Sequence, residues 1–244
     1  MNEDLDSLRF VPIKDYKYSR LFGDIEYNER TLDNKGRKEV IDIIDERVAN
    51  NNKGLSILDE ASLIFNHQIG DFSSIYHIVI SVMTFVLVTM NDSMVAGKYF
   101  LLADKDYDKR FMRGKLMVIL NEGFKRLYGF NDQTHEKSEW YKLLPLMKHF
   151  PEPINHQYQE LTILLEEHSK ASSWWREERN IETHIDAVKL LKSRNVEIIE
   201  SKVMMESLHL YEALHAVNMF LENAHSCLYN YMLDKFHKGE LKDE

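Results

Sequence analysis

The sequence predicts an all-α protein, an antiparallel helical bundle with a long helical hairpin and a long C-terminal helix. The 244 residues include only 9 glycines and 4 prolines. Such a shortage of turn-forming residues disfavours a β-sandwich or barrel, which needs many connections. Apolar residues recur at helical spacing in several stretches, and the last stretch runs for about 40 residues without glycine or proline.

The N-terminal part is expected to divide into an arm and the first helix of the domain. Residues 1–36 carry scattered aromatic residues without a sustained apolar period, which predicts an irregular arm packed on the body. Residues 37–240 are predicted to form the helical domain. At its start, "RKEVIDIIDERVA" places Val40, Ile43, Ile44 and Val48 on one face of a short amphipathic helix. The following "NNNKG" is expected to end that helix.

The centre of the chain predicts a helical hairpin. A helix is expected from about Ser73 to Ala103, although the Ile- and Val-rich first half also fits a buried strand. The helix is favoured because the apolar pattern continues past Asn91 and Asp92. The stretch "DKDYD" is typical of a corner, and "YDKRFMRGKLMVILNEGFKRLYGF" predicts the returning helix.

The C-terminal half predicts an excursion and two further helices. Residues 131–156 contain prolines and are expected to form an excursion from the body with one short helix. "QYQELTILLEEHSKAS" predicts the next helix. From about Glu197 a closing helix would be ~60 Å long, against ~45 Å for a compact body of this size. This helix is therefore expected to kink or to project toward a partner.

Composition indicates a cytoplasmic protein without membrane contact. The single cysteine, Cys227, excludes an internal disulfide framework and fits a reducing compartment. The first residues do not resemble a signal peptide. The most apolar stretch, residues 78–90, is shorter than the about 20 residues that a membrane-spanning helix needs.

The charge distribution leaves nucleic-acid binding open. A net charge of −9 disfavours indiscriminate binding to nucleic acid. Between Lys98 and Arg126, however, eight basic residues outnumber four acidic ones. A solvated helix face and a strip that follows phosphates both explain this excess. Lys109, Arg110 and Arg113 are the candidate phosphate contacts.

Two Glu-x-x-His pairs occur in the closing helix, Glu212-Ala-Leu-His215 and Glu222-Asn-Ala-His225. Carboxylate-bridged dimetal sites use this spacing, but the pairs must converge from different helices. Here they share one helix and lie ~15 Å apart along its axis. They are interpreted as surface or rim residues, and the sequence predicts neither a metal nor a cofactor.

The most specific pattern is Arg179-Asn180-x-x-x-His184, within "WWREERNIETHIDAVKLLKSR". In a regular helix Asn180 lies one turn from His184, whereas Arg179 points about 140° away from it. Arg179 and His184 of one straight helix therefore cannot meet at one phosphate. A site would need a local break, or the same segment from a second subunit across a two-fold axis. The alternative is a charged, solvent-exposed helix face.

This pattern resembles the signature of the HEPN superfamily, which is Arg, a polar residue, about three variable residues and His. The expected order of a helical hairpin, the motif and a long closing helix is also similar, over roughly residues 73–236. The resemblance implies a metal-independent RNA endonuclease that works as a homodimer with both motifs in one cleft. Many members belong to toxin–antitoxin or anti-phage systems, with a cognate antitoxin as partner, and some have lost catalysis.

The resemblance also implies roles for individual residues. His184 would be the general acid/base at the ribose 2′-hydroxyl, and Arg179 would hold the scissile phosphate. Asn180 would orient His184 or the phosphate. The charge pattern, and not the resemblance, makes Arg176 a further candidate nucleic-acid contact, because it could offset the acidic residues around the motif. The competing hypothesis is a non-enzymatic helical interaction module whose closing helix binds a partner protein.

Overall fold

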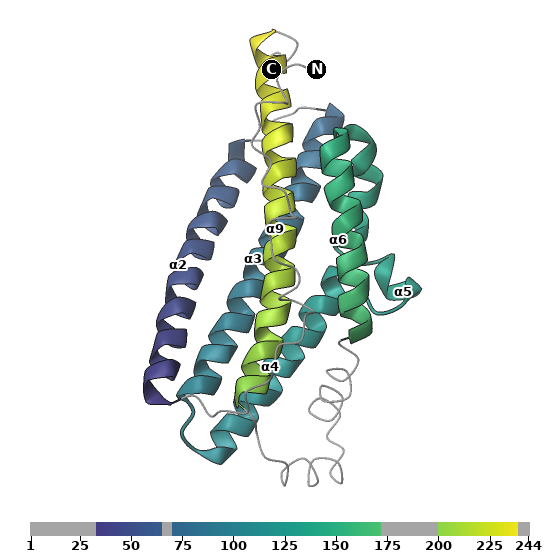
Figure 1. Ribbon diagram of the computed structural model, residues 1–244. Helices are drawn as coiled ribbons and strands as arrows, with labels where there is room; N and C mark the ends of the chain where they lie inside the picture. The colour runs from purple at the N-terminus through teal and green to yellow at the C-terminus, as the bar shows by residue number, and fades with distance from the viewer. Residues whose placement is uncertain (1–32, 65–69, 172–199, 239–244) are drawn as a thin grey trace.

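The computed structural model describes residues 33–64, 70–171 and 200–238. Within these ranges the chain forms seven helical segments and no strand, so the prediction of an all-α bundle is confirmed. The long helices form an elongated bundle (Figure 1). They are α2 (Asn34–Ile64), α3 (Gly70–Leu102), α4 (Asp106–Leu127), α6 (Glu152–Ala171) and α9 (Glu200–His237).

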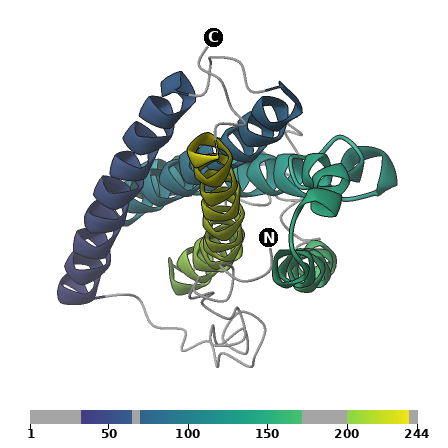
Figure 2. The ribbon, with the colours of Figure 1, turned by 90° about the horizontal axis from the view of Figure 1, so that it is seen from above.

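Helix α3 is the central element of the bundle. It packs against α2, α4 and α9 (Figure 2). Tyr76, Val79 and Phe100 along it are fully buried. The Ile- and Val-rich first half is therefore helical, and the alternative of a buried strand is wrong. Neighbouring helices cover its apolar surface on several sides. For this reason the sequence does not place apolar residues on one face of this helix and polar residues on the other.

The segment Ser74–Leu102 of α3 is also long and apolar enough to cross a membrane. The sequence-based argument against a membrane span counted only the 13 residues 78–90, whereas the segment that meets the criteria has 29 residues. In the bundle, 56% of its most apolar window is buried inside the protein. A central helix of a bundle satisfies the same criteria of length and hydropathy, because it too is surrounded by apolar groups.

Helix α2 does not end at "NNNKG", contrary to the expectation, but runs on to Ile64. The asparagines form hydrogen bonds across to α3: Asn51 Nδ2 donates to Asn91 Oδ1 at 2.9 Å, and Asn91 Nδ2 donates to Asn52 Oδ1 at 2.8 Å. Gly54 lies close to α3, since a Cβ there would be 3.3 Å from Leu87 Cδ1. Tertiary contacts thus outweigh the weak helix propensities of these residues.

The start of α2 lies within the region expected to be irregular. Asp33 Oδ1 accepts a hydrogen bond from Gly36 N at 2.7 Å. This contact is typical of a helix N-cap. "DNKG" therefore begins a helix instead of closing a turn. The rest of the predicted arm, residues 1–32, lies outside the described residues.

The predicted hairpin of α3 and α4 is present, and α4 ends at a glycine with a positive φ. Gly129 has φ 89°, and its N–H and that of Tyr128 both donate to Phe124 O, at 3.4 and 2.9 Å. A Cβ at Gly129 would be 2.5 Å from the backbone nitrogen of His135. Both the left-handed conformation and this close approach therefore require glycine.

The predicted excursion contributes to the core. It contains two short helical segments, α5 (Asp132–His135) and the 3₁₀ helix η3 (Tyr141–His149), where one was expected. Trp140 between them is fully buried and stacks on Tyr158, with ring centroids 4.7 Å apart and an interplanar angle of 8°. Its Nε1 donates to Thr162 Oγ1 at 2.9 Å. The segment is thereby fixed to α6.

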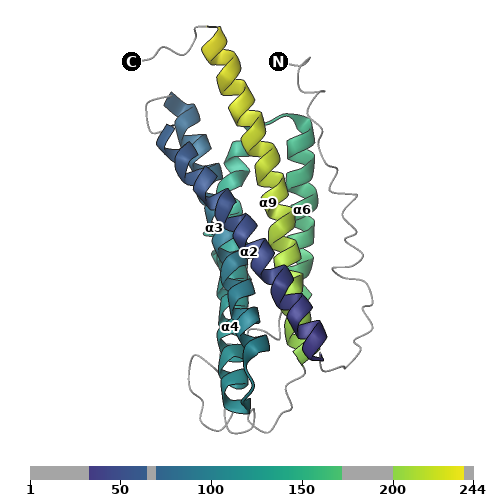
Figure 3. The same cartoon turned by 90° about the vertical axis from the view of Figure 1, so that its left-hand side faces the viewer.

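Helix α9 is one continuous helix of 38 residues. The expectation that α9 would kink or project compared its length with a compact body ~45 Å across, but α3 has 33 residues and the bundle is elongated with it. Most of α9 therefore packs along the bundle, with Leu210, Leu214 and Val217 fully buried. Figure 3 shows its C-terminal end extending beyond its neighbours.

His168 on α6 makes a pH-dependent contribution to stability. Burial, and secondarily the charge of His209, lowers its pKa from 6.5 to about 4. As the pH falls, the imidazole of His168 takes up a proton near pH 6.5 in the unfolded chain but only near pH 4 in the folded chain. Stability is therefore lost as the pH falls through this window, by about 3 kcal/mol. We expect His168→Gln to flatten this part of the stability–pH curve, as measured by urea unfolding. An unchanged slope would contradict the buried, neutral imidazole.

Candidate functional site

The residues of the Arg-Asn-x-x-x-His motif lie outside the described residues. Arg176, Arg179, Asn180 and His184 all belong to the segment 172–199. The described chain stops at the end of α6 and resumes at the start of α9. The structure does describe the residues around the start of α9, which follows the motif in the chain.

Helix α9 begins at a buried carboxylate that joins three helices. Glu200 is 3% exposed. Its Oε1 accepts a hydrogen bond from Arg37 Nη2 at 2.8 Å and another from Lys109 Nζ. The acidic side chain also sits in the first turn of the helix, where the helix dipole favours a negative charge. This cluster fixes the start of α9 against the starts of α2 and α4.

The Glu200 cluster includes one of the three basic residues of α4 that the sequence predicted to contact phosphate. Lys109 was a candidate phosphate contact, but its ammonium group is engaged by Glu200 and its side chain is only 17% exposed. Arg110 and Arg113 are half-buried on the same helix. Of the three, Lys109 therefore has the clearest structural role.

We expect Glu200→Gln to lower the free energy of unfolding by about 2–3 kcal/mol. The change leaves two partly buried cations without their anion, which is costly in a buried ion pair. The matched control is Glu39→Gln, because the Lys35–Glu39 pair is exposed and spans 3.8 Å. That control should cost at most about 0.5 kcal/mol. Equal effects in chemical denaturation would contradict a structural role for the Glu200 cluster.

A groove runs between α2 and α9, with α3 as its floor. Arg37 of α2 contacts Glu200 of α9, and ten residues further along α2, Arg47 contacts Tyr211 of α9. The contacting residues differ by 163 and 164 in sequence number, so the two helices run side by side in the same direction. Each packs along α3, but they make few contacts with one another. The space between them has a volume of about 460 Å³.

Polar residues of α9 face this groove at a heptad-like spacing. These residues are Tyr211, His215, Asn218, Glu222 and His225. They follow one another at intervals of four, three, four and three residues, so they lie on one face of the helix. The sequence interpretation placed His215, Glu222 and His225 on the surface or rim. The structure brings them to one groove, and their spacing was the signal that could have identified it.

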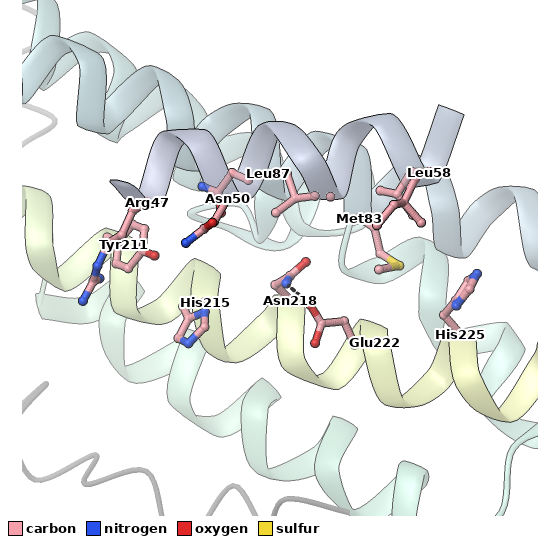
Figure 4. Close-up of a pocket in the computed structure, with 13 residues that line it drawn as sticks. Arg47, Asn50, Leu58, Met83, Leu87, Tyr211, His215, Asn218, Glu222 and His225 are labelled. Carbon is pink, nitrogen blue, oxygen red and sulfur yellow. Dashed lines mark hydrogen bonds between the residues drawn. The ribbon is translucent and has the colours of Figure 1, made fainter. Parts of the chain in front are cut away.

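Hydrogen bonds hold several of these side chains in place. Asn218 Nδ2 donates to Glu222 Oε1 at 2.7 Å, and Tyr76 Oη lies 2.8 Å from His225 Nε2. Arg47 lies over the ring of Tyr211, 4.8 Å from its centroid. Figure 4 shows Arg47 and Tyr211 at one end of the groove and His225 toward the other, with Asn218 between them.

Burial shifts the titratable side chains of α9 in this groove toward their neutral forms. Burial lowers the pKa of His215 and of His225, and the charge of Arg47 adds to the effect on His215. Both imidazoles are therefore neutral at pH 7. Burial raises the pKa of Glu222, while the hydrogen bond from Asn218 opposes this. Within the described ranges, no three His, Cys, Asp or Glu side chains are grouped so that they could hold a metal ion.

Comparison with known proteins identifies no relative. No family model, no curated protein and no solved structure matches the chain. The functional argument therefore depends on the residues themselves.

Proposed function

We propose that the protein is a metal-independent RNA endonuclease of HEPN type, acting as a cytoplasmic homodimer, or a descendant that has lost catalysis. The observation that carries this proposal is the pattern Arg179-Asn180-x-x-x-His184. The fold supports it indirectly. A long helical hairpin, α3 and α4, precedes the motif in the chain, and a long closing helix, α9, follows it. This order is similar to that of the superfamily.

The proposed chemistry needs no metal. His184 removes the proton of the ribose 2′-hydroxyl, and the 2′-oxygen attacks the neighbouring phosphorus to form a 2′,3′-cyclic phosphate. The P–O5′ bond breaks in this step, and the leaving 5′-oxygen takes up a proton. An imidazole titrates in the pH range that this proton transfer requires. Arg179 stabilises the charge that develops on the phosphate oxygens. Asn180 orients His184 or the phosphate through hydrogen bonds. Arg176, Arg110 and Arg113 extend the contact along the RNA backbone, with a smaller part for Lys109.

Mixing two inactive variants tests the composite, two-fold site. We expect Arg179→Ala and His184→Ala each to abolish RNA cleavage, and their mixture, after unfolding and refolding together, to regain part of it. The reason is that a mixed dimer retains Arg179 from one subunit and His184 from the other. Refolded single variants serve as controls. A parent protein that cleaves, with a mixture that stays inactive, would contradict the composite site.

A second candidate function, a protein-interaction module, is favoured by exposed apolar side chains where α3 meets α4. Tyr99, Leu102, Tyr107 and Phe111 are each at least half exposed. Clusters of exposed aromatic and aliphatic groups are typical of interaction surfaces. This function predicts no RNA cleavage under any condition, whereas the nuclease predicts cleavage that depends on His184.

A further inference from the structure

We propose that the groove between α2 and α9 binds a small polar molecule that has an anionic group at one end and N–H donors at the other. The anionic end would lie at Arg47 and the donor end at Asn218 and Glu222. Guanosine monophosphate and L-arginine both have this chemistry. The proposal is independent of the nuclease function, because none of its residues belongs to the Arg-Asn-x-x-x-His motif.

Arg47 provides the anionic subsite. Its guanidinium lies over the ring of Tyr211 and is hydrogen-bonded to that side chain, and in the described part of the chain Arg47 forms no ion pair with a carboxylate. A half-buried guanidinium without an acidic partner has several N–H donors free to hold a carboxylate or phosphate. The stacking on Tyr211 also restricts its conformations, which reduces the entropic cost of binding.

Asn218 provides the donor subsite. Its side chain is 7% exposed, and its Oδ1 accepts no hydrogen bond from any described residue. The orientation of the amide is fixed, because Nδ2 donates to Glu222 Oε1. The remaining atom is thus an acceptor that needs an N–H or O–H from outside the fold. Figure 4 shows this oxygen pointing toward α2, across the groove.

An unsatisfied buried acceptor costs about 1–3 kcal/mol. An apolar residue at position 218 would avoid this cost, as do the apolar neighbours Leu214, Val217 and Leu221 of the same helix. A polar residue at such a site is therefore better explained by binding than by stability. Met83 lines the groove and has a flexible side chain that can move to admit a ligand atom.

The dimensions of the groove fit a molecule with two separate polar ends. Tyr211, which holds Arg47, and Asn218 are seven residues apart, or ~10 Å along the helix. A single phosphate ion cannot reach both. The volume of about 460 Å³ lies within the range of small-molecule sites. The neutral imidazole of His215 lies between the two subsites and can donate or accept a hydrogen bond.

Calorimetric titration with guanosine monophosphate and, separately, with L-arginine tests the proposal. We expect at least one of them to bind the full-length protein with a Kd below about 1 mM. Arg47→Met and Asn218→Leu should each weaken binding at least tenfold. If Asn218→Leu melts at a lower temperature than the parent, Glu222→Gln, which keeps the shape of the side chain, tests the same subsite. Lys53→Met, on the exposed side of α2, is the matched control and should bind normally.

The two ligands distinguish a nucleotide from an amino acid as the natural occupant. His184→Ala should leave binding unchanged, which separates this site from the proposed nuclease centre. The proposal is overturned if neither molecule binds at about 5 mM. It is also overturned if binding persists in Arg47→Met, or in the variant that tests the donor subsite.

Discussion

Replacing Trp140 with alanine is expected to lower the free energy of unfolding by about 3–5 kcal/mol. The indole is fully buried, stacks on Tyr158 and lies 5.4 Å from the ring of Phe220, measured between centroids. Its Nε1 also donates to Thr162 Oγ1. Alanine removes these contacts and leaves a cavity where α6, α9 and the 131–156 segment meet. Chemical denaturation followed by circular dichroism measures the change.

Two controls separate packing from the hydrogen bond. Leu144 lies in the same segment but is 47% exposed, so Leu144→Ala should cost less than about 1 kcal/mol. Thr162→Val removes the acceptor while keeping the shape, and should cost about 1–3 kcal/mol. If Trp140→Ala were no more destabilising than Leu144→Ala, the segment would be a peripheral excursion, as the sequence suggested.

The helical fold could be predicted because local signals agree over long stretches. The scarcity of glycine and proline and the continuous pattern past Asn91 correctly indicated α3, its hairpin with α4 and the closing helix α9. The end of α2 could not be predicted, because "NNNKG" is a strong local signal for a break. The segment is helical in contact with α3, where Asn51 meets Asn91, 40 positions away in the sequence, and Gly54 lies close to Leu87.

The groove was missed for a related reason. The sequence showed that His215, Glu222 and His225 share a helix, but not which helix lies opposite them. That neighbour is α2, whose Arg47 and Asn50 were not considered as site residues. Nor could the sequence show that Lys109 would pair with Glu200, because the two residues are 91 positions apart.

Replacing His184 with alanine is expected to lower the rate of RNA cleavage by about 10²–10⁴-fold, which leaves no detectable product over the time in which the parent cleaves its substrate. Alanine removes the only group proposed to take the proton from the 2′-hydroxyl, while the fold should be unaffected. His149→Ala, an exposed histidine in the described part of the chain, is the matched control and should cleave as fast as the parent. Identical melting curves of the three proteins would exclude unfolding as the cause.

The most direct test is therefore RNA cleavage by the purified protein in EDTA, beside His184→Ala and His149→Ala. The nuclease proposal predicts cleavage by the parent and by His149→Ala, and none by His184→Ala. EDTA should have no effect, because the proposed chemistry uses no metal. Cleavage that persists in His184→Ala, or that EDTA abolishes, would contradict the proposal.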